Sequence, residues 1–136
     1  MKIPVELQYG LLFMCYMAKN PKKRVLAQEL AKEYDFTYEH VAKLMRPLIR
    51  SNLVLGKRGP NGGYVLGRPL NKITFLEIIE SIRGPMVRDD YYIDINKNGE
   101  CVQDLFSILS IFCGSIGDMF SKITLADYVK GKVKIL

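Results

Sequence analysis

Two adjacent cations, Lys57 and Arg58, stand at the base of a glycine-rich turn between two short apolar runs. The runs are Leu53-Val54-Leu55 and Tyr64-Val65-Leu66, and the turn is Gly59-Pro60-Asn61-Gly62-Gly63. Asn-Gly is a strong signal for a β-hairpin, because a type I′ turn needs positive φ at both central residues. A narrow hairpin with cations at its base suits entry into a DNA groove; an ordinary surface hairpin with solvated charges is the alternative.

A second polar set recurs at helical spacing upstream of this hairpin. Four polar residues share one face of the expected helix: Glu39, Lys43, Arg46 and Arg50. Five apolar residues occupy the opposite face: Val41, Leu44, Met45, Leu48 and Ile49. The pattern predicts an amphipathic helix that begins near Thr37 as N-cap, with His40 in its first turn. Pro47 is expected to kink this helix or to end its regular part.

Two further helices are predicted before this one. The first covers roughly residues 4–19, its inner face formed by Leu7, Leu11, Met14, Cys15 and Ala18, and Asn20-Pro21 ends it. The second is shorter and turns Leu26, Leu30 and Ala31 inward. Helix, short helix, polar-faced helix and hairpin follow one another as in a winged helix-turn-helix, with the third helix in the major groove and the wing beside it.

The charge of the chain is unevenly distributed. The 136 residues carry a net charge of +6. Residues 1–67 contain 11 Lys and Arg against 5 Asp and Glu, whereas residues 68–136 contain 9 of each. The whole cationic excess lies in the half that contains the hairpin, which indicates a polyanionic partner.

The cysteine count and the lengths of the apolar runs indicate the cellular compartment. Three cysteines, an odd number, fit a reducing cytoplasm better than a disulfide framework. No run of about 18 uninterrupted apolar residues and no signal peptide is recognised, so we expect a cytoplasmic protein with no membrane partner.

The second half of the chain predicts a connector and a long helix. A helix over residues 76–82 follows Thr74 and ends at Gly84-Pro85, and residues 86–100 are predicted to form a polar loop. A helix of about residues 101–121 carries an apolar seam at alternating spacings of three and four: Val102, Leu105, Leu109, Phe112, Ile116 and Met119. Further apolar residues lie beside the seam, so we predict a homodimer built on this helix; a fully buried intrachain helix is the alternative.

Three segments therefore divide the chain. Residues 1–67 form the predicted DNA-binding unit, residues 68–100 a connector helix with a sensor-type loop, and residues 101–136 the dimerisation helix with a C-terminal segment. The predicted fold class is mostly α with a small β-hairpin wing. No internal repeat is recognised.

Several blocks of this sequence resemble the Rrf2 family of bacterial winged-helix regulators. The wing, Arg58-Gly59-Pro60-Asn61-Gly62-Gly63-Tyr64, is similar to the family's R-G-P-x-G-G-Y signature. Three other blocks are similar to family sequences: residues 44–54, 73–85 and 123–127. The resemblance implies a homodimer that binds operator DNA and regulates transcription, usually as a repressor.

The resemblance also implies particular DNA contacts. Residues at the start of the third helix would meet base edges, Arg58 would enter the minor groove, and Arg46, Arg50 and Lys57 would contact phosphates. The complete predicted set is Thr37, Tyr38, Glu39, His40, Lys43, Arg46, Arg50, Lys57, Arg58, Asn61 and Tyr64. Ala42 departs from an often acidic family position, which bears on sequence preference.

Many relatives in that family hold an iron–sulfur cluster with three closely spaced cysteines before the long helix. Only Cys101 stands there in this chain, and Cys113 lies twelve residues further on, about 18 Å along an ideal helix. The usual three-cysteine cluster is therefore not expected, and Cys15 and Cys113 are interpreted as small buried hydrophobes. Two alternatives stay open at Cys101: an atypical cluster completed by the partner subunit, and a thiol switch.

An enzyme is not expected. His40 is the only histidine, and no glycine-rich phosphate cradle precedes a helix. The remaining alternative to a DNA-binding regulator is a winged-helix module that acts through protein contacts, using the long helix and a loop with Tyr91-Tyr92. Loss of affinity for DNA with rising salt would distinguish the two.

Overall fold

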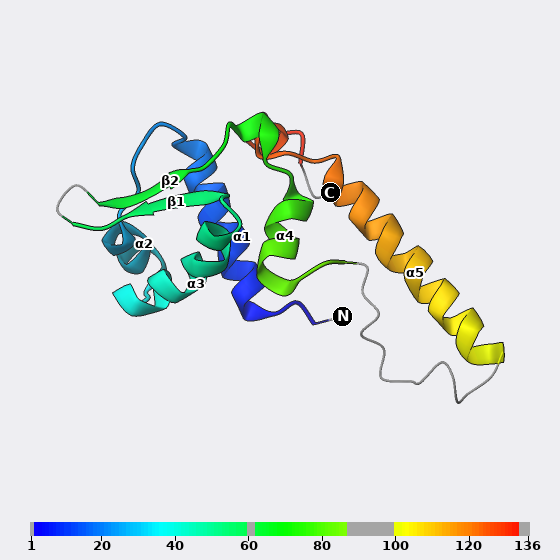
Figure 1. The fold of residues 1–136 in the computed structure, drawn as a ribbon. Helices are drawn as coiled ribbons and strands as arrows, with labels where there is room; N and C mark the ends of the chain where they lie inside the picture. The colour runs from blue at the N-terminus through cyan, green and yellow to red at the C-terminus, as the bar shows by residue number, and fades with distance from the viewer. Residues whose placement is uncertain (1, 60–61, 87–99, 134–136) are drawn as a thin grey trace.

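The computed structural model describes residues 2–59, 62–86 and 100–133, which form six α-helices, one 3₁₀ helix and a two-stranded hairpin (Figure 1). In chain order these elements are α1 Val5–Lys19, α2 Ala27–Tyr34, α3 Tyr38–Arg50, β1 Val54–Lys57, β2 Gly63–Leu66, η1 Leu70–Lys72, α4 Phe75–Arg83, α5 Glu100–Ser121 and α6 Leu125–Val129. The predicted class, a winged helix-turn-helix with a long C-terminal helix, is confirmed.

The core is built around α1, whose Phe13, Met14 and Met17 are fully buried. Apolar residues of α2 and α3 close over them, at the positions that the periodicity predicts: Leu30, Val41, Leu44, Met45 and Leu48. Leu26 is an exception, since it precedes the first turn of α2 and is exposed while Ala27 is buried in its place.

The same core extends beyond residue 67. Ile73, Ile78 and Leu125 are fully buried and belong to the cluster that contains Phe13. The predicted connector and C-terminal segments thus pack into the DNA-binding unit. The division of the chain at residues 67 and 100 therefore stays a prediction about the function of each segment. One hydrophobic core contains residues from all three segments.

The turn between α2 and α3 depends on a left-handed residue. Asp35 has a φ of 56°, and the Phe36 N–H donates to the carbonyl of Ala31 at 2.8 Å. A short polar side chain tolerates this conformation, which lets the chain reverse within three residues. Thr37 then caps α3 as predicted, accepting a hydrogen bond from the His40 N–H at 3.1 Å.

Helix α3 continues through Pro47 and does not end there. Pro47 removes one backbone hydrogen bond, but buried residues on both sides of it hold the helix against the core. The helix ends in a Schellman motif, with Asn52 at a φ of 59° and the Leu53 N–H bonded to the Leu48 carbonyl at 3.0 Å. This ending directs the chain straight into β1.

The wing, defined as residues 54–66, is an antiparallel hairpin, as predicted, but its turn differs from the prediction. Lys57 pairs with Gly63, which leaves a five-residue connection where a two-residue turn was expected. Positive φ falls on Gly59 and Gly63, at 98° and 123°, and not on Gly62. The Gly62 N–H bonds to the Gly59 carbonyl at 2.8 Å, and the residues between them, Pro60 and Asn61, lie outside the described residues.

Helices α4 and α6 begin with the same N-terminal arrangement. Thr74 caps α4 and Thr124 caps α6, each in a capping box closed by a carboxylate three residues later. The backbones of the two threonines also pair as an isolated antiparallel bridge. Arg68 reaches the Glu77 carboxylate at 2.8 Å, which ties the connector after the wing to α4.

Helix α5 extends away from the rest of the molecule, on the side opposite the wing (Figure 1). It packs against α4, and its bounds agree with the predicted helix. Among the described residues, Cys101–Ser121 is the one helix long and apolar enough to cross a membrane by length and composition alone. Little of it is buried within the protomer, so most of its apolar surface faces outward. The predicted polar loop before it lies largely outside the described residues.

The two capping boxes predict a loss of stability in acid. Burial acts to raise the pKa of Glu77, but hydrogen bonds from Thr74 and Arg68 outweigh it and lower the pKa. Hydrogen bonds from the backbone and side chain of Thr124 lower the pKa of Asp127. A lowered pKa in the folded state stabilises the fold above the unfolded value, about 4, and this stability is lost as pH falls through the folded value.

We therefore expect the melting temperature of the wild type to fall steeply below about pH 4. The Glu77→Gln/Asp127→Asn variant should melt lower at pH 7 and depend less on pH in that range. Thermal unfolding followed by circular dichroism between pH 7 and 3 measures both slopes. Parallel pH profiles would contradict the assignment of the acid loss to these two carboxylates.

Candidate nucleic-acid interface

The solvent-facing side of α3 carries the predicted cations. Lys43, Arg46 and Arg50 are exposed, and in the part of the chain that the structure describes none of them pairs with a carboxylate. Glu39 is exposed on the same face, and Tyr38 is largely exposed at the first turn. The face is therefore cationic along most of its length and open to a partner.

The first turn of α3 presents polar hydrogens outward. Thr37 accepts a hydrogen bond from the His40 N–H, so its own hydroxyl hydrogen remains able to donate to another group. The His40 ring packs edge-on against Phe36 at 4.7 Å between ring centroids, and Phe36 contacts Tyr9 at 4.5 Å. These contacts fix the direction of the His40 ring. The N-terminal end of a helix also attracts anions through its unpaired N–H groups.

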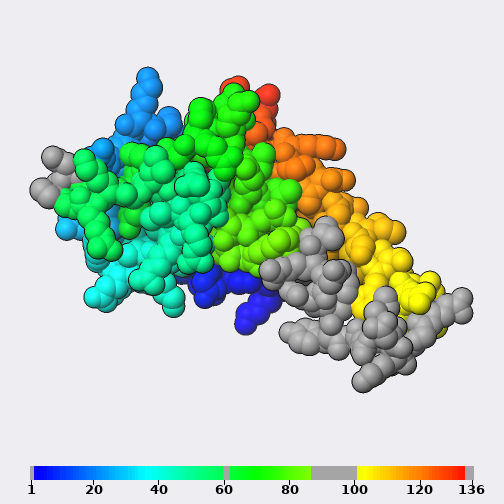
Figure 2. All heavy atoms as spheres, in the orientation of Figure 1, coloured from blue at the N-terminus to red at the C-terminus, as the bar shows by residue number. Residues whose placement is uncertain are grey.

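The two wing cations lie beside this helix. Lys57 and Arg58 are exposed, and among the described residues neither forms an ion pair. β1 follows α3 directly and packs against it, so that α3 and the wing form one continuous surface (Figure 2). The structure thus places the two elements that carry the cations, α3 and the wing, in contact with each other.

A third strand-like segment holds the wing in place. The Val25 N–H donates to the Tyr64 carbonyl at 2.9 Å, and the Tyr64 N–H donates to the Val25 carbonyl at 2.7 Å. Val25 lies in the loop between α1 and α2, so this pair of bonds connects β2 to the helix-turn-helix. The position of Lys57 and Arg58 relative to α3 depends on it.

Two of the residues predicted to contact DNA, Tyr64 and Asn61, are not found on the described exposed surface. Tyr64 is only 9% exposed and belongs to the core cluster, and burial raises the pKa of its hydroxyl. Because protein covers the Tyr64 ring, this side chain packs in the core beneath the wing and is not part of the exposed surface. Asn61 lies outside the described residues.

One cation was missed by sequence reasoning. Arg24 is exposed in the loop before α2, and its Cγ lies 2.8 Å from the position that a Cβ on Gly63 would occupy. It therefore stands beside β2, on the edge of the surface formed by α3 and the wing. The location of Arg24 beside β2 follows from the long-range pairing of Val25 with Tyr64 and is not encoded by any local sequence pattern.

The cysteines do not form a metal site within one protomer. Cys15 is half-buried on α1, while the other two lie on α5, Cys101 exposed and Cys113 half-buried. Burial raises the pKa of the Cys15 thiol, and a hydrogen bond with Tyr128 and the charge of Lys19 oppose this only in part. Among the described residues, which include every cysteine and the only histidine, no group of three ligands could hold a metal ion. The residues do not fit a three-cysteine iron–sulfur centre.

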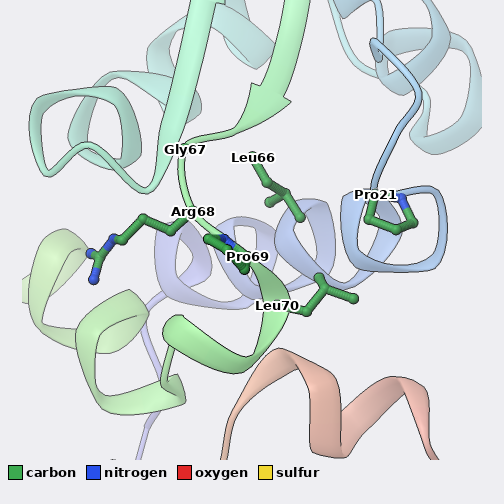
Figure 3. Close-up of a pocket in the computed structure, with 6 residues that line it drawn as sticks. All are labelled: Pro21, Leu66, Gly67, Arg68, Pro69 and Leu70. Carbon is green, nitrogen blue, oxygen red and sulfur yellow. The ribbon is translucent and has the colours of Figure 1, made fainter.

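A shallow hollow of about 340 Å³ lies beside the connector after the wing (Figure 3). It is lined by Pro21, Leu66, Gly67, Arg68, Pro69 and Leu70. Arg68, the one charged residue of the six, points away from the others and is bonded to Glu77 and to the Lys72 carbonyl. The one charged side chain of the lining is therefore engaged outside the hollow.

The predicted dimer seam is divided between two faces of α5. Val102, Leu109 and Ile116 are half-buried within the protomer, whereas Leu105, Phe112 and Met119 are exposed. At about 100° per residue, the seam lies between a half-buried stripe and an exposed apolar stripe. The exposed stripe consists of Leu105, Ile108, Ile111, Phe112 and Met119.

The remaining side of α5 is polar. It consists of Gln103, Ser107, Ser110 and Asp118, all of them exposed, whereas Asp104 and Ser115 lie in line with Ile108 and Ile111 on the exposed apolar side. The helix is thus covered on one side by its own protomer, apolar and open on a second, and polar on a third. Ile108 and Ile111, at 63% and 69% exposure, are the most open large apolar residues of the helix.

This chain is similar to known proteins in both sequence and fold. The sequence model of the Rrf2 family, described as an iron-dependent transcriptional regulator, matches residues 3–131. The HTH-type transcriptional regulator BadM of Rhodopseudomonas palustris is 35% identical over 79 residues, which are 58% of this chain and 51% of BadM. The chain spans about half the length of the curated relatives it matches.

Two solved structures show the same fold over nearly the whole chain. CymR of B. subtilis, described as a global cysteine regulator, superposes with a TM-score of 0.76 at 24% identity, over 96% of this chain and 97% of CymR. A transcriptional regulator from Listeria innocua gives a TM-score of 0.74 at 25% identity, over 98% of this chain and 90% of that one.

The order and arrangement of the elements define a winged helix-turn-helix protein. Within that class, the match over residues 3–131 shows that the chain belongs to the Rrf2 family of transcriptional regulators. Members of this family are regulators and not enzymes, in agreement with the sequence prediction.

Gly63 provides a test of how the wing is positioned. Its φ of 123° is one that side chains rarely adopt, and an added Cβ would lie 2.8 Å from the Val25 carbonyl oxygen. Gly63→Ala should therefore strain or break the Val25–Tyr64 pairing and lower stability by about 1–3 kcal/mol. Urea unfolding measures the loss. Gly56→Ala in β1 is the matched control, because its Cβ would lie 3.1 Å from the flexible end of Ile49 and at an ordinary contact distance of 3.6 Å from the Tyr64 ring. Equal losses would contradict the argument.

Proposed function

We propose that this protein is a homodimeric, sequence-specific DNA-binding regulator, with α3 in the major groove and the wing in the adjacent minor groove. The observation that supports it best is the surface formed by the cations of α3 and the wing. These exposed cations form no ion pair within the part of the chain that the structure describes, so they are available to neutralise phosphates, and each phosphate contact releases counterions.

The proposed contacts follow from the position of each side chain. Thr37, Tyr38, Glu39, His40 and Lys43 lie at the N-terminal half of α3, which is the part of a recognition helix that meets base edges. Arg46, Arg50 and Lys57 would bind phosphates and set the register without reading sequence. Arg58, at the entrance to the wing turn, would enter the minor groove, where narrow A·T-rich tracts attract arginine.

The dimer rests on the exposed apolar stripe of α5. A soluble monomer rarely leaves a continuous apolar stripe in water, so a partner surface is needed. Lipid is a poor partner, because Asp104, which lies in line with Ile108 and Ile111, and Asp118 on the polar side would also enter the hydrocarbon. A second copy related by twofold symmetry brings the same stripe against itself and also places two α3 helices for a two-part operator.

Three finer properties come from the family resemblance. We infer a cytoplasmic protein that acts as a repressor, since members of the family usually repress. A redox response would use Cys101, the one exposed cysteine. A cluster at Cys101 would need ligands from the partner subunit, since the three cysteines of one chain are far apart.

Arg58→Ala tests the DNA surface. The probes are duplexes that the wild type selects from a random-sequence library, measured at 50–300 mM KCl, concentrations on the order of those that separate phosphate contacts. The variant should lose about 1–3 kcal/mol of binding, most of all on A·T-rich flanks. Arg83→Ala, an exposed arginine on α4, should bind as the wild type does. Wild-type affinity that is indifferent to salt would contradict DNA binding and favour a protein partner.

Phe112→Glu tests the dimer. A buried Phe contributes about 1.5–3 kcal/mol, and a symmetric interface loses two of them, so the dissociation constant should rise at least roughly 100-fold. Sedimentation velocity reports the change as a shift to the monomer. Ser110→Glu places the same charge on the polar side of α5 and should leave the dimer intact. A wild type that sediments as a monomer would overturn this part of the proposal.

A further inference from the structure

The two capping boxes are copies of one short motif. Lys72-Ile73-Thr74 and Lys122-Ile123-Thr124 are identical tripeptides, and each is followed three residues after the threonine by a carboxylate, Glu77 or Asp127. The sequence prediction of no internal repeat overlooked this pair, because the copies lie 50 residues apart and only a few positions match.

The copies bind each other reciprocally. The Phe75 N–H donates to the Ile123 carbonyl at 2.9 Å, and the Leu125 N–H donates to the Ile73 carbonyl at 3.0 Å. Each threonine hydroxyl accepts from the N–H of its own carboxylate residue at 3.2 Å. Each carboxylate accepts from the threonine N–H at 3.0 Å. We call these paired segments, residues 73–77 and 123–127, the threonine clasp.

The clasp joins α5 to the DNA-binding unit. Only Lys122 and Ile123 separate the end of α5 at Ser121 from Thr124. On its inner side the clasp is anchored by Ile73 and Leu125, both fully buried in the core that also holds α3. Two residues leave little room for a change of direction, so the angle between α5 and α3 is set by the clasp and by the contact of α5 with α4.

We propose that the threonine clasp determines which half-site spacing the dimer accepts, with Thr74 and Thr124 as positioning residues that touch no DNA. The inference rests on the proposed function. When two protomers join through α5, the separation of their recognition helices follows from the angle at which each α5 leaves its own core. A rigid joint therefore makes the dimer selective for one spacing, since half-sites on one face of DNA are separated by whole helical turns.

The test compares Thr74→Val/Thr124→Val with Thr74→Ser/Thr124→Ser. Valine keeps the shape but removes both hydroxyl acceptors, whereas serine keeps them. The probes are wild-type-selected duplexes with the half-sites moved apart or together by one and two base pairs, and a duplex with one half-site. Fluorescence anisotropy gives each affinity, and sedimentation velocity confirms the dimer.

The wild type and the serine variant should bind the duplex with one preferred spacing at least about 10-fold more tightly than the others. Each added or removed base pair both shifts a half-site along the DNA and rotates it around the DNA axis. The valine variant should bind the single half-site within about twofold of the wild type, but its preference among spacings should fall below about threefold. If the double valine variant does not fold, Thr124→Val alone makes the same comparison with Thr124→Ser.

A folded, dimeric valine variant that keeps the wild-type spacing profile would overturn the inference. A lower melting temperature alone does not support it, because a merely structural cap would destabilise the protein without changing the preferred spacing. Failure of the wild type to select any sequence would instead refute DNA recognition itself, so the two failures are distinguishable.

Discussion

The arrangement of the candidate DNA surface depends on two backbone hydrogen bonds between Val25 and Tyr64. Through them the wing becomes the edge of a three-segment sheet that begins in the helix-turn-helix, and Tyr64 is held in the core. Without this pairing, Lys57 and Arg58 would stand on a two-stranded hairpin, which is marginally stable alone in water. The requirement for glycine at position 63 follows from the same contact, since the Val25 carbonyl leaves no room for a side chain. The glycines of the wing therefore serve packing as much as turn geometry.

Among the described residues, the exposed cations of α3 and the wing form no ion pair with a carboxylate. The described ion pairs, Lys23 with Glu29 and Arg68 with Glu77, involve no residue of α3 or of the wing. A cation already paired with a carboxylate would have to break that pair to meet a phosphate. Unpaired cations repel one another and cost some stability, and the fully buried core beneath α3 offsets that cost. Stability and the proposed binding are thus supplied by opposite faces of one helix.

Sequence reasoning predicted what local patterns encode. Helical periodicity placed the buried residues of α3, and the Thr37 cap followed from residue type and position. What it missed depends on partners distant in the chain. Tyr64 was assigned to DNA because its contact with Val25 is 39 residues away, and Arg24 was overlooked for the same reason. The predicted dimer seam of α5 stays a prediction; apolar periodicity identifies an apolar arc but does not tell which part of it packs against α4. The five-residue length of the wing turn was not predicted, because Asn-Gly also occurs in longer connections.

The cysteines separate this chain from the iron-dependent description of its family. A cluster within one protomer needs several thiolates within a few ångströms of one another, and here one cysteine is half-buried on α1 while the other two are three helical turns apart on α5. Burial further disfavours the thiolate of Cys15, which is the form that binds metal. The spacing excludes a three-cysteine cluster within one protomer, and it leaves exposed Cys101 as the cysteine through which a redox signal would act. Because only Lys122 and Ile123 separate α5 from the clasp, a change at the proposed dimer helix would reach the proposed DNA surface through the clasp and through the contact of α5 with α4.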